Sequence, residues 1–474
     1  MRTLFEQWAG EQCEKVVQLT PSGSNRRYIR LVGEHRRCIA TVNANVEENE
    51  AFFSFASQLA SRGVRVPEVY AVSADRTSYL QQDLGDTTIY SYLVSRKASG
   101  VDTLEDMRRL YTRAVDDLYH MQTVLSDLDY TKAYPRARFD RQALMWDLNY
   151  FKYYFLKMVY APFNEDDLER DFSALADYLL RDCPWQFVYR DFQSRNIMVG
   201  PSEELFYIDF QGCRMGAPQY DLASLLFSGG AAVPSALRAE LLEHYLDLRF
   251  GGIESDIPSE RQQDRRRFEQ KFYGYALIRI LQALGAYGYR GYFERKELFI
   301  KSVPTALSNL TSLLQAHPLP VELPALNAVL RYVCEHDEMV VEEGKLSVKV
   351  FSFSYKRGAP IDRSGNGGGF VFDCRALPNP GRDAIMMGLT GRHTEVKEFL
   401  DSILEVDCFF DNCTSLVRQS VLNYTERGFT SLVVCFGCTG GRHRSVYMAE
   451  RMAAYLKAHF SCRVVLRHME QNYW

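Results

Sequence analysis

A proline-rich segment, HPLPVELPAL at residues 317–326, limits what this chain can fold into more than any other feature. Proline lacks a backbone donor and clashes with the preceding turn of a helix, so three prolines in ten residues interrupt the helical patterns around them. A length of 474 residues allows two or three domains. We therefore predict a first domain over residues 1–316, a linker and connecting helix over 317–344, and a second domain over 345–474.

The patterns differ on the two sides of this segment. In the first domain, RRYIRLVG and RRCIATVN flank the turn-like GEH and predict an antiparallel strand pair. Helical patterns then dominate from Leu104 to Leu314, apart from a β-like block at 186–210. After one expected helix, Leu326–Glu335, the second domain reads as strand, Gly-rich loop, strand, helices, strand, Gly-rich turn and helix. We expect an α+β domain followed by a smaller α/β domain.

Charge and composition exclude several classes of protein. Lys and Arg number 56 against 60 Asp and Glu, and a net charge of −4 argues against a nucleic-acid binder whose whole surface is basic. The eleven cysteines are irregularly spaced, which favours free thiols in a chain of this length. No apolar run reaches the roughly 18 residues of a membrane span, and the first residues lack the order of a signal peptide. We expect a cytoplasmic enzyme with no membrane partner.

Phosphoryl transfer is indicated by the blocks FVYRDFQSRN at 187–196 and LFYIDFQG at 205–212. Transfer from ATP needs one carboxylate to orient the acceptor hydroxyl and take its proton, and an amide and a second carboxylate to hold Mg²⁺ on the phosphates. Asp191, Asn196 and Asp209 supply these groups in the expected chain order. The small residues of PSGSNRRYIRL would let backbone N–H groups approach phosphate oxygens closely, and these residues are Ser22, Gly23, Ser24 and Asn25.

Together with GAPQYDLASLL at 216–226, these blocks resemble the aminoglycoside phosphotransferase and choline kinase family, which has a two-lobed, protein-kinase-like fold. The resemblance implies that Asp191 is the catalytic base and that Asn196 and Asp209 bind Mg²⁺. It also implies that Asp221 braces the catalytic loop. The family's adenine hinge falls at QQDLGD, so the remaining nucleotide-binding candidates are Arg27, Gln82, Asp83 and Leu84.

The sequence departs from the family pattern at two positions. The His that ordinarily lies two residues before the catalytic Asp is Tyr189 here. No lysine occurs between Lys15 and Lys97, so the strand lysine that ordinarily pairs with ATP phosphates is missing. Arg26, Arg27 or Mg²⁺ alone would have to supply the positive charge, and otherwise the domain is an inactive pseudokinase.

Within the family, S-x-S-x-R-R-Y, VPEVYA, the D-L-G hinge and RDFQSRNIM are most similar to kinases that phosphorylate the C1 hydroxyl of N-acetylmuramate or N-acetylglucosamine in cell-wall recycling. The resemblance therefore implies an amino-sugar acceptor. The expected acceptor lobe is aromatic, in MWDLNYFKYYFLKMVY and QKFYGYALIRILQALGAYGYRGYF, and Arg279 or Lys271 would suit a neutral or anionic sugar. An aminoglycoside antibiotic kinase is the alternative, because such kinases bind polycations and tend to offer many carboxylates.

The densest motif of the second domain is CFGCTGGRHRSV at 435–446. A strand enters a turn with two glycines and a helix leaves it. Backbone N–H groups, the helix N-terminus and three adjacent cationic side chains would together favour a bound phosphate. The spacing of Cys438, Arg444 and Ser445 also fits the C-x5-R-[ST] loop of protein tyrosine phosphatases, in which the cysteine attacks phosphorus, but no general-acid loop is identifiable.

Residues from about Leu346 to Gln471 resemble the C-terminal domain of the RNase adapter protein RapZ, in VKVFSFSYKRGAPID, FVFDCRALPNP, LTGRHTEVKEFL and VVCFGCTGGRHRSVYMAERMAAYL. The resemblance implies a domain that senses glucosamine-6-phosphate and binds small regulatory RNA. The P-loop domain that precedes it in that family has no counterpart here, so an RNA partner is the weaker expectation. The implied sugar-phosphate site comprises Cys438, Thr439, Gly440, Gly441, Arg442, His443, Arg444 and Ser445, with Arg375 and His393 nearby.

The sequence thus predicts an ATP- and Mg²⁺-dependent kinase of an amino-sugar hydroxyl. We expect the fused domain to bind an amino-sugar phosphate and to regulate the kinase. The alternatives are an antibiotic kinase, and a non-catalytic pseudokinase that senses glucosamine-6-phosphate and binds RNA. Self-association into a homo-oligomer is a further expectation from the RapZ resemblance.

Overall fold

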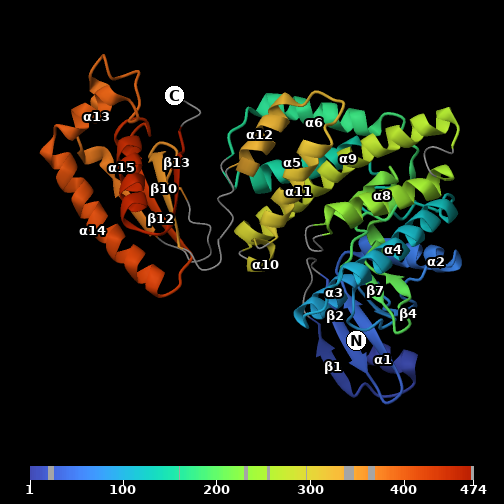
Figure 1. Cartoon of the computed structure of the whole chain (residues 1–474). Coiled ribbons are helices and arrows are strands. Elements are labelled where there is room, and N and C mark those ends of the chain that lie inside the picture. Colours follow the sequence, from blue (N-terminus) through green and yellow to red (C-terminus); the bar gives the residue numbers. More distant parts are fainter. Residues whose placement is uncertain are drawn as a thin grey trace. The chain divides into compact units, whose positions relative to one another are not determined.

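The computed structural model describes residues 1–19, 26–159, 161–228, 233–252, 257–294, 296–300, 302–335, 346–360 and 369–470. The chain divides into two compact units (Figure 1). The first unit comprises Met1–Phe151, Glu165–Leu284 and Thr305–Ala328. The second comprises Lys152–Asn164, Gly285–Pro304 and Val329–Trp474.

The first unit begins with a five-stranded antiparallel sheet of order β1-β2-β3-β5-β4. Its strands are β1 (Lys15–Gln18), β2 (Arg27–Val32), β3 (Arg37–Val42), β4 (Val69–Val72) and β5 (Ser78–Gln81). The predicted antiparallel pair is confirmed as β2 and β3, with Arg27 opposite Val42 and Val32 opposite Arg37. Helix α1 (Arg2–Ala9) contributes Phe5 to the core under this sheet, and α2 (Val46–Ser61) follows β3.

Between β5 and β10, across parts of both units, the described chain is mainly helical (Figure 1). The helices are α3 (Ile89–Ala98), α4 (Leu104–Val124), α5 (Arg141–Phe151), α6 (Glu165–Leu180), α7 (Gln219–Phe227), α8 (Ser235–Phe250), α9 (Ser259–Tyr287), α10 (Glu297–Ile300), α11 (Val303–Ala316) and α12 (Pro324–Glu335). Helix α3 was not predicted from the sequence pattern. Its N-terminus is a capping box, in which Thr88 and Ser91 bond each other's backbone N–H groups.

Two short strand pairs interrupt the helices and position the predicted phosphoryl-transfer residues. Strand β6 (Gln186–Val188) pairs with β9 (Arg214–Gly216), and β7 (Ile197–Val199) pairs with β8 (Leu205–Tyr207). Because β7 and β8 form a hairpin with Ile197 opposite Tyr207, the residues before β7 and after β8 lie at the same end. These residues include Asn196 and Asp209.

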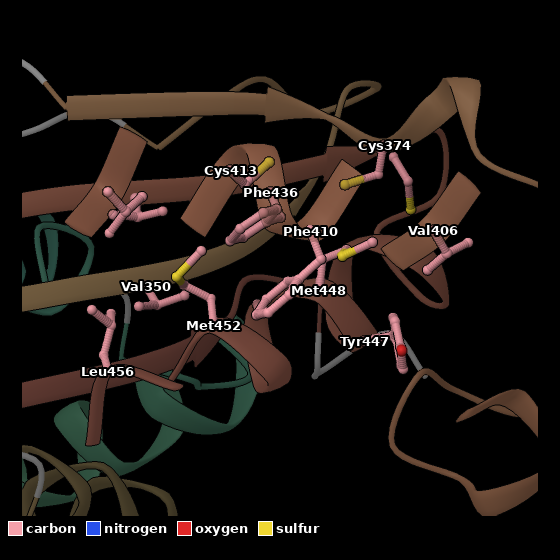
Figure 2. Close-up of a cluster of buried hydrophobic side chains, with 14 of the residues drawn as sticks. Val350, Cys374, Val406, Phe410, Cys413, Phe436, Tyr447, Met448, Met452 and Leu456 are labelled. Carbon is pink, nitrogen blue, oxygen red and sulfur yellow. The ribbon is translucent and has the colours of Figure 1, made fainter. Parts of the chain in front are cut away.

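The second unit contains a four-stranded, fully parallel sheet of order β11-β12-β10-β13. Its strands are β10 (Ser347–Ser354), β11 (Gly369–Asp373), β12 (Ser431–Cys438) and β13 (Arg463–His468). Every residue of β12 is buried, as an apolar strand covered on both faces requires. Figure 2 shows one core of this sheet, where Val350 and Phe436 of the strands meet Phe410 of α14 (Leu404–Glu426) and Met448 of α15 (Arg444–His459).

Several remaining features bear on the sequence predictions. Helix α13 (Thr394–Asp401) completes the expected α/β order of this domain. The stretch SGNGGG lies outside the described residues except for Gly369, which opens β11. No helix in the described ranges combines the length and the apolar character needed to cross a bilayer.

Candidate active site and a second strand-end site

A buried carboxylate holds the loop that carries Asp191. Asp221, in the first turn of α7, is fully buried and accepts the backbone N–H groups of Tyr189 at 2.6 Å and Arg190 at 2.9 Å. Arg190 has a φ of 85°, a left-handed backbone that costs a non-glycine residue about 1–3 kcal/mol. The two hydrogen bonds to Asp221 offset this cost, so the bracing role expected for Asp221 is confirmed.

The side chain of Arg190 also fixes the loop. Its Nη2 donates to both carboxylate oxygens of Asp147, at 2.8 and 2.9 Å, and its guanidinium lies over the rings of Phe139 and Tyr220. Asp191 follows directly, half-buried and not covered by these contacts. The backbone that presents Asp191 is therefore held on both sides by buried polar groups.

Hydrogen bonds connect the three predicted phosphoryl-transfer residues. The side-chain amide of Asn196 donates to the carbonyl of Asp191 at 2.9 Å, and the carbonyl of Asn196 accepts the N–H of Ile208 at 3.0 Å. The Tyr189 hydroxyl donates to the carbonyl of Ile208 at 2.6 Å. Ile208 immediately precedes Asp209, so Tyr189, which stands where the family has His, ties the catalytic loop to the Asp209 backbone.

The residues at this point fit a Mg²⁺ ion. The half-buried Asp209 carboxylate accepts from Gln211 Nε2 at 2.8 Å, and its pKa is raised by burial and then by the negative charge of Asp191. A dication would relieve that repulsion. Among the described residues no three His, Cys, Asp or Glu cluster as metal ligands. Carboxylate and amide oxygens from Asp209 and Asn196 would therefore hold the ion together with water and phosphate oxygens, as Mg²⁺ sites commonly do.

A buried arginine lies next to Asp209. Arg26 is only 3% exposed, and its guanidinium pairs with Glu48 of α2 at 2.7 Å and with Asp209 at 3.4 Å. Glu48 also accepts from the Asn43 side chain at 2.9 Å, and its own N–H is capped by the Asn45 side chain at 3.1 Å. By contrast, Arg27, the nucleotide-binding candidate named from the sequence, is exposed at the start of β2.

The hinge candidates have structural partners of their own. The carboxylate of Asp83 is almost completely buried and accepts from Arg30 at 2.8 and 3.1 Å and from the N–H of Gly85 at 3.0 Å. The N–H of Gln82 donates to the Glu68 carbonyl at 2.8 Å. These contacts shape the hinge, while nucleotide contacts from Gln82, Asp83 and Leu84 stay a prediction. Ser22, Gly23, Ser24 and Asn25 lie outside the described residues.

Buried positive charge surrounds Asp191 on its other side. Arg279, 6% exposed, lies 4.0 Å from the Asp191 carboxylate and donates to the Tyr220 hydroxyl at 3.1 Å. Its Nε is buried without a hydrogen-bond partner. Arg214 is also buried, and desolvation and then the neighbouring charge of Arg190 lower its pKa to about 10. Sequence reasoning did not find Arg214, because nothing in the pattern marks a strand arginine as a neighbour of the base.

In the second unit, the loop after β12 has the predicted strand–turn–helix form. Gly441 has a φ of 66°, and a Cβ there would lie 2.3 Å from Cγ of Glu470 and 3.0 Å from the N of Ser354. Gly440 faces open space, and Thr439 is exposed. At the ends of the loop, Cys438 Sγ and Ser445 Oγ lie 3.1 Å apart and buried. Thr439 and Gly440 are thus the most exposed residues of the loop.

The three cationic side chains of this motif bond to protein carbonyls. Arg442 donates to the carbonyls of Gly388 and Leu389, and His443 Nε2 lies 3.0 Å from the Met386 carbonyl. Arg444, 6% exposed, donates through Nη1 to the carbonyls of Arg375 at 2.8 Å and Leu377 at 2.7 Å. Burial is the largest cause lowering the pKa of His443, which favours its neutral form. The sequence identified a cationic cluster, whereas in the structure these side chains fasten residues 375–389 to the loop.

The two outlying candidates are placed differently. Arg375 pairs with Asp373 at the end of β11, with its guanidinium over the Tyr355 ring at 4.0 Å. His393 precedes α13, and its Nδ1 lies 2.9 Å from the Thr390 hydroxyl. Arg375 and Arg444 both line a cavity of about 720 Å³ whose wall also includes Asn379, Arg382 and Leu404. His393 is not part of that wall.

Strand β12 carries a second cysteine, and the sequence-based interpretation that the chain has no C-x-x-C pair is wrong. Cys435 and Cys438 have C-x-x-C spacing, a pattern that can mark a redox or metal pair. Both lie in β12, where residues three apart point to opposite faces. Cys435 packs with Phe351 and Phe353, while Cys438 belongs to the core shared with α15. The structure therefore separates the two thiols.

The fold and the geometry of the first site define a phosphotransferase of the protein-kinase-like class. Residues 15–256, just over half of the chain, match the model of the phosphotransferase enzyme family, and the chain belongs to that family. Residues 346–472 match the model of the RapZ C-terminal domain. Both resemblances and the predicted fold class, a kinase-like α+β domain followed by a smaller α/β domain, are confirmed.

Several curated relatives are described as nucleotide-binding proteins. A nucleotide-binding protein of Dinoroseobacter shibae is 39% identical over 160 residues, which are 34% of this chain and 48% of that protein. One from Cupriavidus taiwanensis is 30% identical over 240 residues, 50% of this chain and 76% of that protein. The chain spans less than half the length of the first curated relatives it matches. Among solved structures, choline kinase LicA from Streptococcus pneumoniae is 16% identical with a TM-score of 0.42, covering 65% of this chain and 98% of that one.

Proposed function

We propose that this protein transfers the γ-phosphoryl group of ATP to a hydroxyl of an amino sugar of the N-acetylmuramate or N-acetylglucosamine type, with C1 as the reacting position. The observation that carries this proposal is the hydrogen-bonded set that joins Asp191, Asn196 and the backbone before Asp209. A chain that had lost catalysis would have no need to keep these three groups together at one point.

The proposed mechanism assigns one task to each group. Asp191 accepts a hydrogen bond from the acceptor hydroxyl and takes its proton as the new O–P bond forms and the bond to ADP breaks. Asn196 and Asp209 hold Mg²⁺, which when bound neutralises charge on the phosphate oxygens. Asp221 and Arg190 keep the Asp191 backbone in place, so that little reorganisation is needed during the reaction.

The charges near Asp191 favour a sugar over an antibiotic polycation. The buried Arg214 and Arg279 and the largely buried Arg190 all lie near this carboxylate. A polyamine acceptor would meet like charges in a region of low dielectric, which is unfavourable. A neutral or acidic sugar meets no such repulsion.

An acceptor screen tests the proposal. The full chain is incubated with Mg²⁺ and γ-labelled ATP, with N-acetylmuramate, N-acetylglucosamine or kanamycin as acceptor. We expect label on the N-acetylated sugars, loss of that label in Asp191→Asn, and full activity in Asp177→Asn, which removes an exposed carboxylate of α6. Label on kanamycin alone would establish the antibiotic kinase instead. Absence of transfer together with tight, salt-dependent RNA binding would establish the pseudokinase.

For the second domain, we propose that it binds an amino-sugar phosphate such as glucosamine-6-phosphate at Thr439 and Gly440 and thereby regulates the kinase. The exposed glycine turn before the N-terminus of α15 supports this, because such turns accept phosphate groups. Calorimetric titration with glucosamine-6-phosphate, and kinase turnover with and without it, test the two parts separately. No heat of binding and no change in turnover would reject this role.

Three further expectations follow from the domain match and the thiols. RNA binding and self-association are proposed for the second domain on the RapZ match, and gel-shift and sedimentation experiments test them. The eleven cysteines form no disulfide in the structure, and on this ground we propose a reducing, cytoplasmic location.

A further inference from the structure

The sequence left Arg26, Arg27 and Mg²⁺ as alternative sources of positive charge for the ATP phosphates, and only Arg26 of the two arginines is buried beside Asp209. A phosphoryl-transfer site needs positive charge on the phosphates besides the metal ion. No lysine occurs between Lys15 and Lys97, so none of β2, β3 or α2 supplies an ammonium group. We propose that Arg26 binds the ATP phosphates and that Glu48 holds it in position. This inference rests on the proposed function and identifies the residue that binds the ATP phosphates in it.

The position of Arg26 follows from strand register. Arg27 lies opposite Val42 and Tyr28 opposite Thr41, so Arg26 is the next residue beyond the paired end of β2, beside Asn43. Side chains alternate along a strand, and Arg26 therefore projects to the same face as Tyr28 and Thr41, while Arg27 projects to the other. The exposure agrees, because Arg26 is buried and Arg27 is exposed. Only one of the two adjacent arginines faces the site.

The contacts of Arg26 explain its orientation. One oxygen of the Glu48 carboxylate accepts from Asn43 and the other pairs with Arg26 Nη2 at 2.7 Å, so Glu48 cannot turn without losing a partner. The Nη1 atom of Arg26 lies 3.4 Å from Asp209, the predicted Mg²⁺ ligand. A phosphate bound to an ion on Asp209 would lie within reach of the same guanidinium. The planar Arg26 guanidinium thus contacts both the Glu48 carboxylate of α2 and the Asp209 carboxylate, the predicted Mg²⁺ ligand.

The chemistry of the group suits phosphate. A guanidinium is always charged and presents two parallel N–H groups that match two phosphate oxygens, which an ammonium on a flexible stem cannot do. Two carboxylates face Arg26, so the site without nucleotide carries more negative than positive charge at this point. With Asp209 engaged by a metal ion, Arg26 would be able to turn its Nη1 side toward the phosphates. Glu48 continues to hold the other side.

Binding of nucleotides that differ only in phosphate number tests this role. Adenosine, ADP and ATP, the last two with Mg²⁺, are titrated into the full chain by calorimetry. The variants are Arg26→Gln, Arg26→Lys, and Arg27→Gln as the exposed control one residue away. We expect Arg26→Gln to weaken ATP binding about ten- to hundred-fold, the worth of a charge-assisted hydrogen bond, with adenosine affinity unchanged. Arg26→Lys should recover part of the loss, and Arg27→Gln should bind as wild type does.

A positive charge moved to β3 provides a second measurement of this role, beside Arg26→Lys, which keeps the charge in place. Thr41 is buried on β3 opposite Tyr28, on the face from which Arg26 projects. Arg26→Gln/Thr41→Lys should regain ATP affinity over Arg26→Gln alone, since it restores one positive charge to that face. Equal loss of adenosine and ATP affinity in Arg26→Gln, or wild-type ATP affinity in it, would overturn the inference. If the acceptor screen shows phosphoryl transfer while Arg26→Gln binds ATP normally, this inference fails and the proposed function stands.

Discussion

Replacing Asp221 by asparagine should change how the stability of the kinase domain depends on pH. Burial is the main cause that raises the pKa of Asp221 to about 7, and the N–H groups of Tyr189 and Arg190 oppose it. In an unfolded chain the pKa of an aspartate is about 3.9. The folded state therefore binds this proton more tightly than the unfolded state. The contribution of Asp221 to stability is full below pH 4 and is lost as the pH rises through about 7.

The size of the effect follows from the two pKa values. Above pH 5 the unfolded aspartate is ionised, whereas the folded carboxyl stays protonated until about pH 7. Each pH unit over which only the unfolded state is ionised costs about 1.4 kcal/mol of stability. The wild type should therefore lose about 2.5 kcal/mol between pH 5 and pH 8 relative to a side chain that does not titrate. For a domain of this size that corresponds to roughly 5–10 °C in melting temperature.

Thermal unfolding of the full chain at pH 5, 6, 7 and 8 measures this change. Asp221→Asn leaves one of the two N–H groups without an acceptor, which costs about 1–3 kcal/mol at every pH, so the pH slope is diagnostic and the absolute gap is not. Asp177→Asn, the same chemical change at an exposed carboxylate, is the control. We expect the melting temperature of the wild type to fall toward that of Asp221→Asn, or below it, as the pH is raised through 7. Parallel profiles for wild type and Asp221→Asn would refute the argument.

Three shorter predictions concern other contacts. Tyr189→Phe deprives the Ile208 carbonyl of its hydroxyl partner, so we expect a stability loss of about 1–3 kcal/mol and a higher Mg²⁺ requirement for phosphoryl transfer; an unchanged Mg²⁺ titration would contradict this. Gly440→Ala should leave the melting temperature unchanged and weaken sugar-phosphate binding. Gly441→Ala should lower the melting temperature, because the φ of Gly441 is 66° and an added Cβ would contact Glu470. Equal melting temperatures of the two variants would contradict this prediction. Arg279→Gln should lower kcat/KM for N-acetylmuramate more than for N-acetylglucosamine, since only N-acetylmuramate carries a carboxylate. Equal losses would exclude a role for Arg279 in recognising that carboxylate.

The sequence identified the phosphoryl-transfer residues because they are close together along the chain. Asp191 and Asn196 belong to one loop, and a single hairpin, β7 and β8, returns the chain to Asp209. Such local geometry needs no knowledge of the rest of the fold. The bracing role of Asp221 was implied by the family resemblance instead, because the backbone groups it binds, at Tyr189 and Arg190, lie far from it along the chain.

Residues whose role depends on burial were harder to assign. Arg26 and Arg27 are adjacent, and the sequence does not reveal where β2 begins or which of the two faces inward. The sequence left both arginines open as the source of positive charge and named Arg27 alone among the nucleotide-binding candidates, whereas the register of β2 against β3 makes Arg26 the buried one. Arg214 and Arg279 likewise approach Asp191 only through packing of segments far apart in the chain.

Whether a buried arginine can bind a ligand depends on its hydrogen-bond and ion-pair partners rather than on its burial or charge alone. Arg444 and Arg26 are both almost completely buried, and a buried guanidinium must be satisfied to remain there. The Nη1 of Arg444 bonds two backbone carbonyls, at Arg375 and Leu377, which keep their places whether or not a ligand arrives. Arg26 instead faces the Asp209 carboxylate, which could bind a metal ion in place of Arg26. Exchange of that one carboxylate for phosphate would keep Arg26 Nη1 paired, whereas drawing Arg444 Nη1 onto a ligand would leave two carbonyls unpaired. The cationic motif that stands out most in the sequence is therefore mainly architectural, and the less conspicuous arginine at the edge of β2 is the one placed to exchange partners.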